Sequence, residues 1–182
     1  MNAWLSTDGQ VFALPLDDSR PHAHSILEAI YEMGVLFGEN PEVRAAAIEI
    51  VSQTGIRDGD VHSAVDAISL WVQQAMRWIP DPHGTERVES PLVLLQTIAE
   101  RGRAYGDCDD HVILFVALVR AIGPDARPVG VQLGTDPFDP TRFDHVIASV
   151  PMPDGTSKDY DLCAKFWPAG HYVERLVIAW SN

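Results

Sequence analysis

Gly106-Asp107-Cys108-Asp109-Asp110 is the stretch that decides the fold, because it leads through His111 into the unbroken apolar run 113–119. A helix that is apolar on all sides is buried, so this run predicts a core helix with Cys108 near its N-terminus. Backbone N–H groups and the positive end of the helix dipole stabilise an anion there, which favours a thiolate. The same N–H groups can receive the oxyanion of a tetrahedral intermediate. Taken alone, the pattern fits a buried and inert cysteine equally well.

The chain after this helix changes to a strand pattern. Gly123-Pro124 ends the helix, and the sequence that follows alternates β-forming residues with clusters of Pro, Gly and Asp. Strands are predicted over 127–133, 143–150, 156–162 and 172–178.

The residues before Cys108 predict mainly helices up to residue 78. A hairpin is expected over 3–14, with its turn at 7–10. Helices are expected over 26–37 behind a Ser25 cap, from Pro41 to before Gly55, and over 61–75 behind an Asp60 cap. Residues 17–24 are expected to form a loop, and residues 77–80 a short strand.

Ser90-Pro91 predicts one more helix, over 92–101, because Ser caps a helix and Pro suits its first position. Residues 102–106 are expected to form a loop. Helices followed by antiparallel strands indicate the α+β class, with a helical N-terminal half and a buried central helix packed on an antiparallel sheet. We expect a single domain over 1–182, with 1–59 as an N-terminal hairpin and helical extension and 60–182 as the core.

The acidic composition disfavours two classes of binding partner. The formal net charge of −13 disfavours nucleic acid and anionic membrane surfaces as partners. No run of about 18 apolar residues predicts a membrane span, and the first residues lack the basic and apolar regions of a signal peptide. We therefore expect a cytoplasmic protein in which Cys108 and Cys163 are reduced thiols.

A cysteine nucleophile needs a base that takes its proton and a third group that orients the base. The predicted strands supply His145 and two acids, Asp159 and Asp161. The order along the chain is Cys at a helix start, His on a strand, and Asp on the next strand. This order makes the helix start and the two strands a candidate catalytic site.

The turn between those strands decides which acid faces His145. Two prolines, at 151 and 153, cannot donate ladder hydrogen bonds, so they favour a five-residue loop over 151–155. Residue 150 then pairs with residue 156, and Asp161 lies directly opposite His145. A tight turn at 154–155 would instead place Asp161 on the opposite face of the sheet. We therefore predict a hydrogen bond between Asp161 and His145, with Asp159 farther away.

Three strings carry a resemblance to a known family: GDCDDHVILFVALVRAIG over 106–123, FDHVIASV over 143–150, and DYDL over 159–162. Together they resemble the transglutaminase-like superfamily, a branch of the papain-like cysteine enzymes. The segment over 78–110 is similar to a phage and prophage subgroup of that superfamily, encoded among virion morphogenesis genes.

The resemblance implies a cysteine-dependent hydrolase that acts on amide or peptide bonds through Cys108, His145 and Asp161. It implies a peptide or protein substrate, and association with other proteins of a virion or its tail. Two alternatives come with the same family: acyl transfer to an amine, and a catalytically inactive fold that serves as a phage structural or assembly protein.

A metal site is a further alternative. Cys108 and His111 are three positions apart on one helix, and Asp109, Asp110 and His145 could complete a zinc site. No motif supplies a second cysteine ligand, so we expect no metal and no cofactor. We expect His111 to cap or pack, or to serve as a spare base.

Overall fold

The computed structural model describes residues 4–5, 11–15, 20–57, 59–82, 85–132, 143–163 and 174–176. Its helices are α1 (Arg20–Gly38), α2 (Pro41–Ser52), α3 (Val61–Ala75), α4 (Pro91–Arg101) and α5 (Cys108–Ala121). Its strands are β1 (Trp4–Leu5), β2 (Val11–Pro15), β3 (Met76–Trp78), β4 (Thr85–Glu89), β5 (Ala104–Gly106), β6 (Arg127–Gln132), β7 (His145–Pro151), β8 (Ser157–Tyr160) and β9 (Glu174–Leu176).

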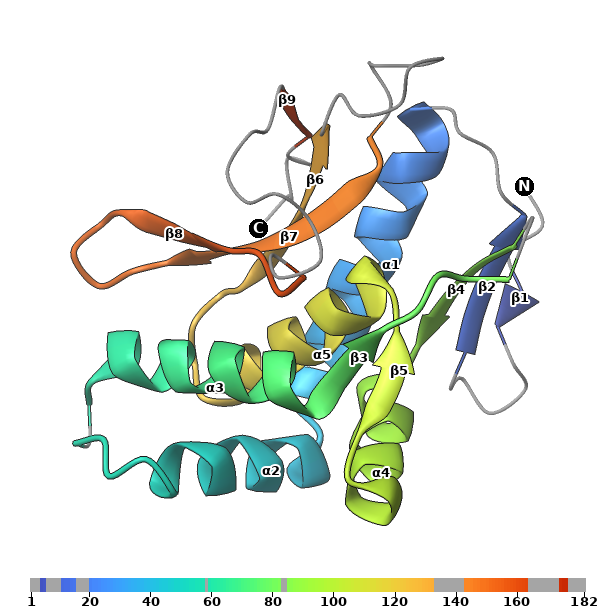
Figure 1. Cartoon of the computed structure of the whole chain (residues 1–182). Helices are drawn as coiled ribbons and strands as arrows, with labels where there is room; N and C mark the ends of the chain where they lie inside the picture. The colour runs from blue at the N-terminus through green and yellow to red at the C-terminus, as the bar shows by residue number, and fades with distance from the viewer. Residues whose placement is uncertain are drawn as a thin grey trace.

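The strands form three sheets (Figure 1). The main sheet has the order β8-β7-β6-β9 and is antiparallel throughout. A second antiparallel sheet joins the N-terminal hairpin to the middle of the chain in the order β1-β2-β4. β3 and β5 form a short parallel pair. Helices and an antiparallel sheet in one chain confirm the predicted α+β class.

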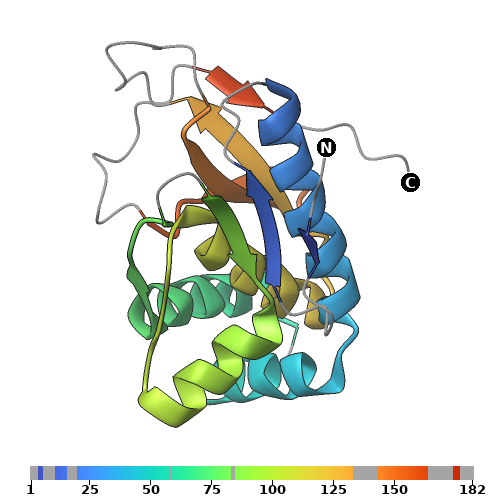
Figure 2. The same cartoon turned by 90° about the vertical axis from the view of Figure 1, so that its right-hand side faces the viewer.

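Helix α5 is the centre of the core. The side chains from Val112 to Val119 are completely buried. The helix packs against α1, α2, α3 and β7. Figures 1 and 2 show it enclosed between the main sheet on one side and α2 and α3 on the other. The predicted central helix is therefore confirmed.

Two glycines let α1 approach α5 closely. A Cβ atom at Gly34 would lie 2.5 Å from Cγ1 of Val116, and one at Gly38 would lie 2.9 Å from Cβ of Arg120. Non-bonded heavy atoms do not come this close in proteins. A side chain at either position would therefore force the two helices apart. The close approach holds the face of α5 that carries Val116 and Arg120 directly against α1.

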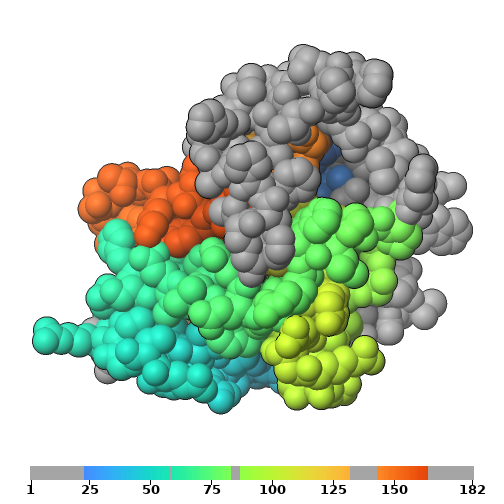
Figure 3. Space-filling view, in the orientation of Figure 1, coloured from blue at the N-terminus to red at the C-terminus, as the bar shows by residue number. Residues whose placement is uncertain are grey.

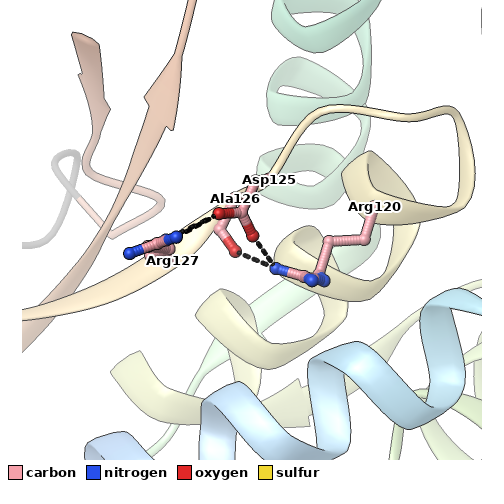
Figure 4. Close-up of polar contacts among 4 residues, drawn as sticks. All are labelled: Arg120, Asp125, Ala126 and Arg127. Atoms are coloured by element: carbon pink, nitrogen blue, oxygen red, sulfur yellow. Dashed lines mark hydrogen bonds and ion pairs between the residues drawn. The ribbon is translucent and has the colours of Figure 1, made fainter. Parts of the chain in front are cut away.

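Arg120 fixes the turn that leads from α5 into the main sheet (Figure 4). Its guanidinium donates to the carboxylate of Asp125 and to the carbonyl oxygen of Ala126, the latter at 3.2 Å. Arg127 donates to the other oxygen of Asp125 through Nε at 2.7 Å. These bonds hold the start of β6 against the end of the helix.

Most predicted helix starts are confirmed. Asn40, Asp60 and Ser90 each accept backbone hydrogen bonds as the caps of α2, α3 and α4. The predicted start of the first helix is wrong, because α1 begins at Arg20 and replaces part of the expected loop. Pro21 lies in its first turn, where the missing N–H costs no helical hydrogen bond.

β4 and β5 have no counterpart among the predicted strands. β4 carries mostly polar residues and only one buried apolar side chain, Val88, so its sequence lacks a strand pattern. β5 has only three residues, in a segment expected to be loop. Both strands are held by their partners β2 and β3 rather than by local sequence preference.

Candidate active site

Cys108 is the first residue of α5, as predicted, and is partly exposed. Gly106 precedes it at the end of β5, and a Cβ atom there would lie only 2.2 Å from Oδ2 of Asp110. Glycine is therefore required two residues before the thiol, because the chain folds back onto the first turn of its own helix. Asp107 occupies the N-cap position but makes no side-chain capping hydrogen bond.

His145 is the first residue of β7, and its side chain is completely buried. Its Nε2 atom lies 3.0 Å from Oδ1 of Asp161, whose side chain is only 12% exposed. The same oxygen accepts the backbone N–H of Cys163, also at 3.0 Å. Two donors thus hold the carboxylate against the imidazole. The predicted hydrogen bond between Asp161 and His145 is confirmed, and Asp159 is exposed on the strand.

The strand register that was used to predict this contact is wrong by two residues. The structure pairs Val150 with Lys158 rather than with residue 156. The loop has the predicted length, but it spans 152–156 instead of 151–155, because Pro151 still pairs with Ser157. A shift of two residues keeps every side chain on its predicted face. Asp161 therefore still reaches His145, from just beyond the end of β8.

Three polar side chains that no sequence motif marks hold β8 onto α3. Asp66 of α3 accepts from the hydroxyl of Tyr160 at 2.7 Å and from Nζ of Lys158 at 2.6 Å. Burial raises the pKa of Asp66, but these hydrogen bonds outweigh it and the pKa lies below its usual value. Since Tyr160 directly precedes Asp161, this contact anchors the strand that carries the acid.

The first turn of α5 gathers three carboxylates. Oxygen atoms of Asp107, Asp109 and Asp110 all lie within 4.8 Å of one another. Asp110 accepts the backbone N–H of Glu89 at 2.7 Å, which ties β4 to α5. Oδ1 of Asp109 accepts the backbone N–H of Asp110 at 2.8 Å, whereas Oδ2 of Asp109 and Oδ1 of Asp107 are buried without a hydrogen-bond donor among the described residues.

Two acids of this group, Asp109 and Asp110, and the nearby Asp81 have a raised pKa. Burial raises the pKa of Asp109 well above its usual value, and the charge of Asp107 adds to the effect. Burial likewise raises the pKa of Asp110 far more than its hydrogen bond from Glu89 lowers it. Asp81 lies near the same group, and burial together with the charge of Asp107 raises its pKa to about 6. The raised pKa values of Asp109 and Asp110 reduce the negative charge that would otherwise oppose a thiolate at Cys108.

The zinc alternative does not match this arrangement. Among the described residues, the group of possible metal ligands within 4.8 Å contains the three carboxylates and neither Cys108 nor a histidine. Nδ1 of His111 lies 2.6 Å from the carbonyl oxygen of Asp107. A carbonyl oxygen only accepts, so this nitrogen carries a hydrogen and donates to the preceding turn. This is not a cap, since the free groups at a helix N-terminus are N–H donors, and His111 instead packs completely buried. Cys163 is buried, as expected of a packing residue.

Comparisons with known proteins identify a family for most of the chain. A family model described as the transglutaminase-like superfamily matches residues 49–172, more than half of the chain. No curated protein matches the chain in sequence. Among the described residues, no helix is long and apolar enough to cross a membrane.

Two solved structures are similar in fold. One is a "putative protease" from Parabacteroides distasonis ATCC 8503, with a TM-score of 0.50 and 15% identity, covering 72% of this chain and 25% of that protein. The other is a "putative cysteine protease" from Cytophaga hutchinsonii, with a TM-score of 0.47 and 20% identity, covering 84% of this chain and 48% of that protein. The chain thus spans from a quarter to about half of the length of these proteins.

Proposed function

Because the chain belongs to the transglutaminase-like superfamily, we propose that it is a cysteine-dependent hydrolase that cleaves amide or peptide bonds. Cys108 is the nucleophile, His145 the general base and acid, and Asp161 the residue that orients the imidazole. The observation that carries this proposal is the buried 3.0 Å contact between Nε2 of His145 and Asp161. A buried imidazole held by a carboxylate is the arrangement that a base needs to receive a thiol proton.

The contact also assigns the two ring nitrogens. Nε2 donates to Asp161, so Nδ1 is the nitrogen that takes the proton from the thiol of Cys108. The thiolate attacks the carbonyl carbon of the substrate, and a C–S bond forms as the carbonyl oxygen becomes an oxyanion. The backbone N–H of Cys108, at the first position of α5, stabilises that oxyanion.

The reaction then ends in two steps. The imidazolium of His145 gives its proton to the leaving amine, the C–N bond breaks, and a thioester remains on Cys108. Water attacks the thioester while His145 takes one of its protons. The carboxylic acid leaves, and the returned proton restores the thiol. Asp161 stabilises the imidazolium throughout without taking the proton itself.

Labelling with iodoacetamide as a function of pH tests the nucleophile. We expect Cys108 to react as a thiolate well below the usual thiol pKa of about 8.5. Cys163→Ala should keep this reaction, and Cys108→Ala should lose it. If Cys108 titrates like an ordinary thiol, the fold serves as a non-catalytic structural or assembly protein instead.

Digestion of a peptide library tests the reaction type. We expect products with new carboxyl termini that are absent with Cys108→Ala and His145→Ala. Adding a primary amine distinguishes acyl transfer, because a transferase would give the amide of that amine in place of the acid. Amide as the dominant product would replace hydrolysis by transfer as the function.

For the biological setting, we propose a phage or prophage protein made in the host cytoplasm and associated with other proteins of a virion. The support is the resemblance of residues 78–110 to a phage subgroup. The net charge of −13 further disfavours nucleic acid and anionic membranes as partners. Mass spectrometry of purified virions from the source phage should detect the chain, and its absence there would contradict the association.

A further inference from the structure

We propose that Tyr160 is a positioning residue of the active site, which holds Asp161 against His145 through its contacts with two helices. The inference rests on the proposed function, because it names a residue that acts on the catalytic groups without touching the substrate. It concerns the geometry of the acid, which is a separate matter from the stability of the fold.

The main-chain pairing of β7 with β8 ends just before the acid. Ala148 pairs with Tyr160, which is the last residue of β8. The same register would place Asp161 opposite Ile147, two residues from His145, so the contact between acid and imidazole runs diagonally across the strands. Diagonal neighbours lie farther apart than directly paired residues. The exact position of Asp161 at the end of β8 therefore decides whether it reaches the imidazole.

The hydroxyl of Tyr160 is held by α3. It donates to Oδ1 of Asp66 at 2.7 Å, and Nζ of Lys158 donates to the same carboxylate at 2.6 Å. Burial and the hydrogen bond to Asp66 raise the pKa of Tyr160, so the phenol keeps its proton and remains a donor at neutral pH. Hydrogen bonds to a charged acceptor are stronger than neutral ones. Figure 3 shows the orange hairpin of β7 and β8 resting on the green α3 at the surface.

The ring of Tyr160 packs on the helix that carries the nucleophile. Its centroid lies 5.1 Å from the ring centroid of Phe115, and the two ring planes are tilted by 41°. Phe115 is completely buried in α5 and follows Cys108 by seven residues, which is about two turns of helix. One side chain, itself only 6% exposed, thus connects the end of β8 to both α3 and α5.

The residues after the acid hold it from the other direction. Leu162 and Cys163 are buried, and the N–H of Cys163 donates to Oδ1 of Asp161 at 3.0 Å. Asp161 therefore lies between two anchors, with Tyr160 as the one on its N-terminal side. Loss of the bond from Tyr160 should let the carboxylate move away from His145 while the buried residues keep the segment folded.

Two variants break the bond between β8 and α3 from opposite ends. Tyr160→Phe removes the hydroxyl and keeps the ring on Phe115, and Asp66→Ala removes the acceptor. We expect each to lower kcat about tenfold with little change in KM, because a displaced acid orients and stabilises the imidazolium less well. Thr156→Val is the matched control, because it removes a hydroxyl that donates to an aspartate at 2.6 Å at the far end of the same hairpin.

A second substitution at Asp161 distinguishes positioning from a general structural role. If Tyr160 acts through the carboxylate of Asp161, Tyr160→Phe should have no further effect on kcat in the Asp161→Asn background. An equal fold-loss in the parent and in that background, or an equal loss from Thr156→Val, would overturn the inference.

Proton NMR separates this inference from the proposed function, because it requires no enzyme activity. The hydrogen on Nε2 of His145, held by Asp161, should give a downfield signal that exchanges slowly with water. We expect Asp161→Asn to abolish this signal, Tyr160→Phe to speed its exchange at least severalfold, and Thr156→Val to leave it unchanged. Unchanged exchange in Tyr160→Phe would refute the inference and leave the hydrolase intact. The expected response in a protein that cleaves no peptide would refute the hydrolase alone.

Discussion

The candidate site contains two groups of largely buried acids, and the structure compensates their charge in different ways. Asp161 has a histidine and a backbone N–H at 3.0 Å each, so its charge is matched by donors. Asp109 and Asp110 have mainly each other, Asp107 and single backbone donors. Proteins tolerate a buried carboxylate either by pairing it or by leaving it protonated.

The difference indicates two separate roles. A charged Asp161 can orient His145 and stabilise its imidazolium. Asp110 can join β4 to α5 through the N–H of Glu89, and the raised pKa of both Asp109 and Asp110 reduces the negative charge that they place beside Cys108. Substitutions at four aspartates test this contrast between a charged acid and neutral ones. The substitution with the largest expected effect is at Asp161.

Removing the charge of Asp161 should have the largest effect. Asp161→Asn can present an amide group to Nε2 that fails to fix the tautomer, so kcat should fall by roughly 10²–10⁴-fold. Asp159→Asn is the matched control, because Asp159 is exposed and lies only two residues away. Peptide cleavage rates measure the effect. A similar loss in both variants would mean that the acid assignment is wrong.

Removing the acceptor at Asp110 should destabilise the fold. Asp110→Ala leaves the partly buried N–H of Glu89 without its 2.7 Å partner, which should cost about 1–3 kcal/mol of unfolding free energy. Asp110→Asn keeps an acceptor and should cost clearly less. Urea denaturation compares the two. Equal losses would show that the charge of Asp110, rather than its hydrogen bond, stabilises the native state.

The raised pKa of Asp109 should make the protein less stable as pH rises. Below the usual pKa of 3.8 this carboxyl is protonated in both the folded and unfolded states, and its contribution to stability is fully present. Between that value and the raised pKa of the folded state, the unfolded chain has released this proton while the folded chain still holds it, so stability falls as pH rises. Above the folded pKa the loss is complete.

Asp109→Asn should abolish that loss. We expect the variant to be more stable than the parent at pH 7.5 and to differ less from it at pH 4.5, as measured by urea denaturation at both values. A variant that is destabilised equally at both values would mean that Asp109 is charged and usefully paired in the folded protein.

The link between Asp66 and β8 should give the smallest effect. Lys158 and Asp66 are both about half exposed, so their ion pair contributes little, and the bond from Tyr160 contributes most of the remainder. We expect Asp66→Asn to cost about 0.5–1.5 kcal/mol of unfolding free energy. Tyr160→Phe should cost nearly as much, and Lys158→Gln much less. A large loss from Lys158→Gln would contradict this order.

The sequence was sufficient for features that depend on local pattern. The apolar run 113–119 predicts a buried helix without any knowledge of its neighbours, and Asp60 and Ser90 show how caps mark helix starts. The contact between His145 and Asp161 was also predictable, because side chains alternate along strands and a shift of two residues preserves the face.

Features that depend on distant segments were not predictable in the same way. β4 becomes a strand because β2 pairs with it, and the paired residues are 70 to 78 positions apart in the sequence (85 − 15 and 89 − 11). The ionisation of Asp109 depends on burial and on Asp107, so the composition of the first turn could not reveal it. Asp66 lies on a helix far from Tyr160 in sequence, and no motif marks their contact.

The close approach of α1 to α5 has a consequence during synthesis of the chain. Gly34 meets Val116, which is added 82 residues later (116 − 34). At about 5–20 residues per second, a ribosome needs roughly 4–16 seconds to add them. During that time Leu27 and Ile30, which are buried in the finished protein, lack the α5 surface that α1 packs against. The growing chain therefore exposes apolar side chains of α1 before the helix that carries Cys108 exists.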